Sequence, residues 1–397
     1  MRTATTEGAG SGRVPGKTRF SGPTLPSWAN GAIAAAVLLV AFLIPYLGFV
    51  DQGGDVMNNM ILAAVYVVMA LGLNIIVGFA GLLDLGYVAF FAIGAYTVGY
   101  VASGFHANAD IHILVSDFAQ SQPGIHVNFI LVFVLAIVAT TIAGMVIGLP
   151  TLRLRGDYIA IVTLAFGEII GRIAINGDEI KFLDTKLTAG RQGITPVDPF
   201  YLPGLDPFKR VADIRPWFYV ALVLCAIVLF VNFRLRDSRL GRAWIAIRED
   251  EVAASSMGVP LVKTKLMAYG TGAAFGGLSG ALLASYTNTV NADQFQFSFS
   301  IFILAMVILG GLGSIWGVVL GAIVLSVINN YVIPKANNVP DTFGLDFDLT
   351  ELSFGIFGFL LVIMMVLRPE GLLPERRRKL ELEEGVGAED AIEARLS

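Results

Sequence analysis

The longest uncharged stretch of the chain limits its possible folds most strongly. Residues 294–334 contain no Asp, Glu, Lys or Arg over about 41 positions. A single α-helix of that length would be roughly 60 Å long, twice the thickness of the hydrocarbon core of a membrane. The stretch must therefore break, and the glycine-rich segment at 310–313 is the expected break because glycine tolerates many backbone conformations.

The composition makes a soluble fold untenable. Hydrophobic residues make up 55% of the 397 residues and charged residues only 15%, against roughly 25% charged residues in an ordinary globular domain. A water-soluble fold of this size cannot bury so much apolar surface. The net charge of −4 excludes a broadly basic nucleic-acid-binding protein, and the single cysteine, Cys225, excludes a disulfide framework. We therefore expect an all-α polytopic membrane protein.

Apolar runs long enough to cross a bilayer recur along the chain and predict about ten transmembrane helices. They lie at 31–50, 55–84, 84–110, 127–150, 158–175, 216–233, 266–290, in the two halves of 294–334, and at 352–367. Residues 1–30 are too polar to fold alone and predict a disordered N-terminal tail, and residues 372–397 predict a C-terminal tail. Residues 31–371 then form a single membrane domain.

The distribution of basic residues predicts the orientation of this domain. With ten spans, nineteen of the 27 Lys and Arg residues fall on the side that holds both termini, and eight fall on the other side. Because basic residues concentrate in cytoplasmic loops, both termini are expected in the cytoplasm. The segment 234–265 is then a cytoplasmic loop. Segment 176–215 is an external loop, although its six basic residues are more than such a loop usually carries.

One segment of the predicted cytoplasmic loop suggests a short helix suited to docking. Acidic residues at its start match the positive end of a helix dipole, small residues give it a low profile, and a glycine ends it. These residues are Glu249, Asp250, Glu251, Ala253, Ala254 and Gly258. The pattern resembles the EAA-x3-G signature of ABC importer permeases, which implies docking onto an ATPase subunit. An amphipathic connector with a glycine cap is the alternative interpretation.

Four further segments extend the resemblance over residues 58–371. They are GLLDLGY at 81–87 followed by GAY at 94–96, RGDYIAIVTLAFGEII at 155–170, GGLGSIWG at 310–317, and RPEG at 368–371. In this order they resemble the LivM-type permease family of branched-chain amino acid ABC importers. The resemblance implies a type II importer-like permease in the bacterial inner membrane. It also implies four partner subunits: a LivH-type permease, two cytosolic ATP-binding subunits and an external substrate-binding protein.

Several glycines are candidates for helix packing or for the transport pathway. Gly313, Gly317 and Gly321 recur every fourth residue, as do Gly276 and Gly280, and such spacing lets two helix backbones approach closely. A role in lining a pore remains an alternative for these glycines. Gly94 belongs to the same set of candidates. The segment from Gly81 to Gly86 is either a simple break between two spans or a re-entrant element near the pathway.

Charged residues inside predicted spans are candidates for function. Glu168 and Arg172 are four residues apart and can pair on one helix face. We expect this pair near the outer end of its span, where it anchors the helix. Asp84 is expected near the inner boundary as a cap of the following helix. The three histidines, at 106, 112 and 126, match no compact zinc pattern, so no metal or cofactor is expected.

The resemblance and the residues together predict a transport subunit for leucine, isoleucine and valine. The chain has no Walker A sequence, so ATP hydrolysis is expected in separate subunits and the chain is not expected to be an enzyme. Urea or a short-chain amide is the alternative substrate. A less favoured alternative is an ion-coupled secondary transporter, for which Glu168 is the candidate protonatable group. Basic residues 376–379 predict contact with lipid head groups.

Overall fold

The computed structural model describes residues 42–43, 45, 55–115, 120–151, 158–182, 185–201, 213–336, 352–368 and 370–373. The chain divides into residues 1–43 and residues 44–397, and every element described below belongs to the second unit. The predicted first span at 31–50 lies almost entirely outside the described residues. Both predicted tails also fall outside them, apart from residues 372 and 373.

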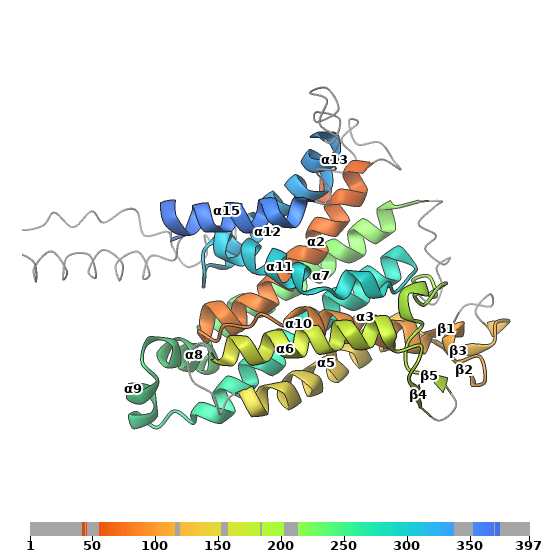
Figure 1. Cartoon of the computed structure of the whole chain (residues 1–397), viewed down its shortest axis with the longest axis horizontal. Coiled ribbons are helices and arrows are strands. Elements are labelled where there is room, and N and C mark those ends of the chain that lie inside the picture. The colour runs from red at the N-terminus through yellow and green to blue at the C-terminus, as the bar shows by residue number, and fades with distance from the viewer. Residues whose placement is uncertain are drawn as a thin grey trace, which may run out of the picture. The chain divides into compact units, whose positions relative to one another are not determined.

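Apolar helices dominate the second unit (Figure 1). Among the described residues, six of these helices are long and apolar enough to cross a membrane. They are α2 (Asp55–Asn74) with its π-helical extension η2 (Ile75–Phe79), α5 (Phe129–Thr151), α6 (Tyr158–Asn176), α7 (Arg215–Asp237), α10 (Leu261–Thr287), and α12 (Ile315–Val327) continued by the π-helical η6 (Ile328–Val332) and α13 (Ile333–Ala336). Three shorter apolar helices are α3 (Val88–Val101), α11 (Phe297–Gly310) and α15 (Ser353–Leu367). A predominantly helical, multi-pass architecture is thus confirmed, and the count of ten spans stays a prediction.

The expected break in the longest uncharged stretch is confirmed. Helix α11 ends at Gly310 and α12 begins at Ile315. Between them Gly311 and Gly313 have φ values of 115° and 85°, which L-residues with a Cβ rarely adopt. The side chain of Ser314 accepts a hydrogen bond from the Gly317 N–H and caps the new helix.

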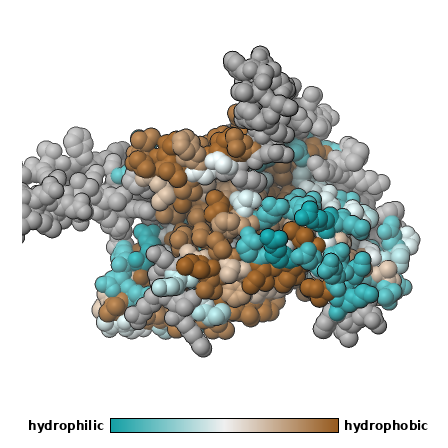
Figure 2. Space-filling model, in the orientation of Figure 1, coloured by the Kyte–Doolittle hydropathy of each residue, from teal (hydrophilic) through white to brown (hydrophobic). Residues whose placement is uncertain are grey.

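Helix α10 lies at the centre of the packing and contacts α5, α3 and α2 extensively. Most of the central part of α2 and α10 is buried, whereas only about a third of the apolar part of α5, α6 and α7 is buried. Figure 2 shows hydrophobic residues over the middle of the visible face and hydrophilic residues toward its two ends. This distribution is the one expected of a protein whose middle is surrounded by lipid.

The two ends of the helical bundle carry different structures. Helices α8 (Arg239–Glu249) and α9 (Glu251–Ser256) lie at one end, and the strands lie at the other (Figure 1). The strands are β1 (Ala102–Ser103), β2 (Asp110–Ile113) and β3 (Gly124–Val127) in the order β1-β3-β2, and the pair β4 (Lys181–Phe182) and β5 (Thr185–Lys186). Short 3₁₀ turns are η3 (Gly104–His106), η4 (Gly190–Gln192) and η5 (Ala292–Phe295). The expected all-α fold is therefore corrected by small strands, which are too short to give a period-2 pattern in the sequence.

The described part of segment 176–215 packs onto the strand end of the bundle. Asp198 N–H donates to the carbonyl oxygen of Ala102 over 2.7 Å, and Val197 forms a bridge with Ser103. Ile194 exchanges two main-chain hydrogen bonds with Val290, each 3.0 Å long. Because these contacts reach β1 and the end of α10, the described part of the loop is joined to the membrane domain.

Candidate functional site

The predicted short helix is present as α9, and Asp250 starts it. The Asp250 carboxylate accepts hydrogen bonds from the main-chain N–H groups of Val252 and Ala253, at 2.8 and 2.9 Å. An acidic N-cap satisfies free N–H groups and interacts favourably with the helix dipole. After α9 the chain turns at Gly258, whose φ is 85°. The acidic start and the glycine end therefore have the local structural roles expected from the sequence.

The two alanines of α9 do not share a surface. Ala253 is exposed, whereas Ala254 is only 4% exposed and packs inside this chain. The expectation that both form a low docking profile is therefore wrong for Ala254, because the short helix turns one face toward its own bundle. The outward side instead presents Val252 and Met257, with exposed fractions of 74% and 86%. Apolar side chains this exposed at the polar end of the bundle suit contact with another protein.

Three contacts fix the α8–α9 segment to the membrane helices. Lys265 at the start of α10 is buried, and its Nζ lies 2.7 Å from Glu251 Oε1. The buried Trp244 on α8 donates from Nε1 to the Thr264 carbonyl oxygen over 2.8 Å. Arg248, also on α8, donates from Nη1 to the carbonyl oxygen of Gly78 at the end of η2. The sequence pattern did not single out these anchoring residues, because each contacts a partner far along the chain.

The segment that joins η2 to α3 lies directly against α8. Gly81 has a φ of 69°, and a Cβ placed there would lie 2.5 Å from Arg248 Cγ. Leu82 N–H donates to the Ile76 carbonyl oxygen over 3.0 Å. Gly81, at the start of the Gly81–Gly86 segment, is therefore a further point at which α8 contacts the helical bundle.

Asp84 does not cap α3, which corrects the role expected for it. It is buried, and its Oδ1 accepts a 2.9 Å hydrogen bond from the Gly86 N–H, which closes a local turn. The N–H of Val88, the first residue of α3, donates instead to Ser300 Oγ on α11 over 3.0 Å. The cap of α3 comes from a residue 212 positions away, which sequence spacing cannot reveal.

Helix α6 packs closely against this turn. A Cβ on Gly86 would lie 1.8 Å from the carbonyl oxygen of Thr163, and a Cβ on Gly167 would lie 2.9 Å from Gly86 Cα. Thr163 Oγ1 also accepts a 3.1 Å hydrogen bond from the Leu85 N–H. The turn and α6 therefore contact each other through backbone atoms, and Gly86 is required by that contact.

The helix glycines of α3 and α10 have the geometry of close packing. A Cβ on Gly94 would lie 2.1 Å from the Gly277 carbonyl oxygen, and one on Gly280 would lie 2.0 Å from the Phe91 carbonyl oxygen. Gly276 approaches Phe90 Cβ less tightly, at 3.1 Å. These distances favour the packing interpretation over the pore-lining one.

The second glycine series divides between a helix and a turn. A Cβ on Gly317 or on Gly321 would lie 2.3 Å from a carbonyl oxygen of α11, that of Gly310 or of Met306. Gly313 lies before α12 begins, so it does not share their helix face as expected. Its N–H donates to Oδ1 of the buried Asn74 over 2.9 Å. Asn74, which the sequence analysis missed, thus joins the end of α2 to the α11–α12 turn.

Glu168 and Arg172 lie close together on the exposed side of α6. Arg172 Nε is 3.9 Å from Glu168 Oε2, and the two side chains are 75% and 46% exposed, respectively. Glu168 is one residue past Gly167, the midpoint of the Tyr158–Asn176 helix. The expected position near the outer end is therefore corrected, because the helix continues for eight residues beyond Glu168.

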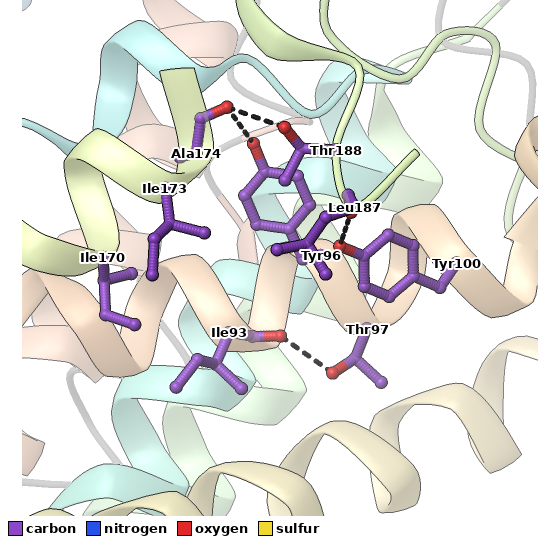
Figure 3. A pocket seen from close by; sticks show the side chains of 9 residues that line it. All are labelled: Ile93, Tyr96, Thr97, Tyr100, Ile170, Ile173, Ala174, Leu187 and Thr188. Atoms are coloured by element: carbon purple, nitrogen blue, oxygen red, sulfur yellow. Dashed lines mark hydrogen bonds between the residues drawn. The ribbon is translucent and has the colours of Figure 1, made fainter. Parts of the chain in front are cut away.

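An apolar pocket of about 200 Å³ lies between α3, α6 and the loop after β5 (Figure 3). Its walls are Ile93, Tyr96, Thr97, Tyr100, Ile170, Ile173, Ala174, Leu187 and Thr188. Both tyrosine and both threonine hydroxyl groups already donate to main-chain carbonyl oxygens. The remaining lining is aliphatic and aromatic, so the pocket suits an apolar group.

Two of the histidines meet in the sheet at the other end of the bundle. His112 on β2 and His126 on β3 are opposite each other, with ring centroids 5.2 Å apart and nearly parallel rings. The buried His126 Nδ1 lies 2.7 Å from Asp198 Oδ2, and His112 Nδ1 lies 3.3 Å from Asp110 Oδ1. Burial raises the pKa of Asp198 above its usual value, although the His126 contact opposes that shift. Within the described residues, no three His, Cys, Asp or Glu side chains form a group that could hold a metal.

The structure is that of a multi-pass membrane protein. Its apolar helices are long enough to cross a membrane, the charged helices α8 and α9 lie at one end, and the short strands lie at the other. A profile described as the permease component of the branched-chain amino acid transport system matches residues 56–365. The chain therefore belongs to the family of branched-chain amino acid transport permeases.

Individual relatives agree with this assignment. The chain is 36% identical over 394 residues to the LivM high-affinity branched-chain amino acid permease of Escherichia coli K12, covering 93% of this chain and 83% of that protein. It is 26% identical to a probable LivM permease of Methanocaldococcus jannaschii, covering 78% of this chain and 91% of the relative. The LivH permease of Salmonella typhimurium is 26% identical over a shorter region, 40% of this chain. No solved structure matches the chain.

Proposed function

We propose that this chain is a permease subunit of a binding-protein-dependent ABC importer for leucine, isoleucine and valine. The relatives are named as branched-chain amino acid transport permeases of both the LivM and the LivH type. In the proposed assembly the chain and a LivH-type permease form the translocation pathway together. Two cytosolic ATP-binding subunits supply the energy, and an external binding protein delivers the substrate. In this proposal the chain lies in the bacterial inner membrane, crosses it ten times and has both termini in the cytoplasm.

The observation that carries the coupling part of this proposal is the anchoring of α8 and α9. Val252, Met257 and the turn at Gly258 face outward, while Glu251, Trp244 and Arg248 are tied to α10 and η2. A subunit that moves the outer surface of α9 therefore displaces the ends of two central helices. This arrangement supports transmission of ATPase closure through residues 249–258.

Branched-chain amino acids fit this chain better than urea or a short amide. The pocket between α3 and α6 has no hydroxyl group that is not already donating to the main chain. Its lining suits an aliphatic side chain, but the ammonium and carboxylate groups of an amino acid need polar partners outside this pocket. The names of the relatives support the same choice.

Reconstitution in liposomes tests the proposal directly. The chain is co-expressed with its neighbouring LivH-type permease and ATPases, and ATP hydrolysis and solute uptake are measured with receptors loaded with leucine or with urea. We expect leucine-loaded receptor to stimulate both, and urea-loaded receptor to stimulate neither. Uptake driven by a proton or sodium gradient in vesicles without the ATPases would instead establish the secondary-transporter alternative.

The orientation is tested by labelling intact cells. Single cysteines introduced at residues 250 and 397 are expected to react with a membrane-impermeant maleimide only after the cells are opened. Labelling of either position from outside would contradict the proposed topology.

A further inference from the structure

Two neighbouring helices expose surfaces of different chemistry. Helices α5 and α6 both lie at the surface of the bundle, with only 28% and 33% of their most apolar segments buried. The 23-residue α5 has no charged residue, and its large exposed side chains are all apolar. These residues are Ile130, Leu131, Val134, Leu135, Val138, Ile142, Met145, Val146 and Leu149. The surface of α5 is therefore suited to lipid.

The exposed surface of α6 forms one continuous stripe with a different composition. Its exposed residues recur at intervals of three or four, which places them on one face of the helix. They are Tyr158, Ile161, Ala165, Ile169, Arg172 and Asn176, with the half-exposed Glu168 among them. We call these seven residues the α6 stripe. The opposite side of α6 is buried, and there a Cβ on Gly171 would lie 2.8 Å from the Phe295 carbonyl oxygen.

Lipid is a poor cover for the α6 stripe. Glu168 is one residue from the midpoint of a membrane-length helix, and a charged side chain near the bilayer centre is unfavourable when lipid surrounds it. The pair it makes with Arg172 is long, 3.9 Å, and leaves Arg172 largely exposed and Glu168 half-exposed. A protein surface or trapped water must therefore satisfy these charges.

A second copy of this chain does not match the stripe. Two copies related by an axis along the membrane normal hold equivalent residues at the same depth, so Glu168 would lie opposite Glu168 and Arg172 opposite Arg172, and only diagonal Glu168–Arg172 pairs could offset the repulsion. The like-charge pairs are unfavourable. A different chain can instead place polar groups of the opposite sign at each depth.

We propose that the α6 stripe is the surface that packs against the second, LivH-type permease, with Glu168 and Arg172 in the contact between the two subunits. This inference rests on the proposed function, which requires a second permease. The inference extends the proposed function by naming the helix and the helix face through which the two permeases contact each other. It also places the exposed face of α5 in contact with lipid.

Photocrosslinking from single cysteines tests this assignment. Cys225 is changed to Ser, and cysteines are introduced one at a time on the stripe, at 161, 165 and 169. Matched control positions are 134, 138 and 142 on α5. Each variant carries a benzophenone maleimide and is co-expressed with an epitope-tagged LivH-type permease, and adducts are measured in native membranes after illumination.

We expect adducts with the tagged permease to be at least tenfold more abundant from the stripe than from α5. Equal yields, greater yields from α5, adducts of the stripe with a second copy of this chain, or no adduct with the tagged permease would each overturn the proposal. The assay needs neither ATP nor substrate. If adducts form but the reconstituted importer does not take up leucine, the proposed substrate is wrong and the proposed interface is supported. If leucine uptake succeeds but the stripe gives no adducts, the proposed interface is wrong and the proposed substrate is supported.

Removal of the charges provides a second test that does not depend on crosslinking. The double variant Glu168→Leu/Arg172→Leu gives α6 an apolar surface like that of α5. We expect the amount of copurified LivH-type permease to fall at least fivefold, while the variant chain remains in the membrane at its normal level. The control pair Val134→Leu/Val138→Leu should leave copurification unchanged. Unaltered copurification of the α6 variant would contradict a role for the pair at the interface.

Discussion

Arg248 on α8 donates a hydrogen bond to the main-chain carbonyl oxygen of Gly78, at the π-helical end of the first described membrane helix. The two residues are 170 positions apart. The same arginine side chain lies over Gly81, where the backbone turns away from the helix. This contact connects the proposed ATPase-docking end of the chain to the segment that leads into α3.

Loss of the Arg248 contact should weaken coupling more than assembly. In Arg248→Ala the Gly78 carbonyl loses its charged donor, so movement of α8 is transmitted less well to η2. We expect leucine uptake per ATP hydrolysed to fall severalfold in the reconstituted importer. Arg242→Ala on the same helix is the matched control, because the Arg242 guanidinium donates instead to the exposed carbonyl oxygen of Asp237, the last residue of α7. An equal loss in both variants would contradict a specific role for Arg248.

Gly86→Ala should destabilise the protein strongly. Its Cβ would lie 1.8 Å from the Thr163 carbonyl oxygen, and main-chain atoms cannot rotate away. Overpacking of this kind costs about 1–3 kcal/mol or more, so the melting temperature of the purified chain in detergent should fall by several degrees.

Gly358→Ala provides the contrast for Gly86. No atom of the described residues lies within 4 Å of a Cβ on Gly358, and alanine is favoured over glycine inside a helix by roughly 0.5–1 kcal/mol. We expect an unchanged or slightly higher melting temperature. Equal melting temperatures for the two alanine variants would show that Gly86 is not held against α6 in this way.

The Glu251–Lys265 pair should respond asymmetrically to mutation. The Lys265 side chain is 6% exposed and that of Glu251 is 47% exposed, so only the ammonium group depends on its partner for charge compensation. Glu251→Gln should therefore destabilise the protein, though by less than the ~3–5 kcal/mol of a fully buried pair. The double variant Glu251→Gln/Lys265→Met should recover most of this loss in thermal melts. If Lys265→Met alone proved the more damaging single change, this explanation would fail.

Substitution of Gly258 separates docking from folding. Its Cβ would contact nothing within 4 Å in the part of the chain that the structure describes, and asparagine tolerates the left-handed conformation found there better than most residues. Gly258→Asn should therefore fold normally but lower the amount of copurified ATPase subunit severalfold, because the added side chain occupies the docking surface. Ala254→Arg is not an equivalent test, since Ala254 is buried inside the chain. Normal ATPase recovery with Gly258→Asn would place the docking surface elsewhere.

The strand end should lose stability as pH rises above about 4. Burial raises the pKa of Asp198 above its ordinary value of 3.8, so the folded protein holds this proton more tightly than the unfolded chain. The contribution of Asp198 to the free energy of unfolding is therefore fully present below pH 3.8. It is lost as the pH rises through the raised pKa of the folded state.

Hydrogen exchange of residues 185–201, measured between pH 4 and 7 after correction for intrinsic rates, tests this prediction. Protection in the wild-type chain should fall with pH more steeply than in Asp198→Asn, which does not titrate. Parallel pH profiles in the two proteins would contradict it.

The sequence by itself determined the class of protein. The length of its apolar runs and its low content of charged residues require a membrane environment, however the helices pack. It also predicted the break between α11 and α12 and the acidic start of α9, because glycine conformation and the caps by Ser314 and Asp250 are local. The Asn74 contact that holds the α11–α12 turn is not local and was not predicted.

Only the tertiary structure decided the contacts between distant segments. Ser300 rather than Asp84 caps α3, Gly313 lies in a turn bound to Asn74, and Ala254 faces inward. The short strands near His112 and His126 also escaped prediction, since two- to four-residue strands are stabilised by their pairing rather than by their own sequence. Spacing along a chain specifies which residues share a helix face, but the partner of that face is fixed by how the helices pack.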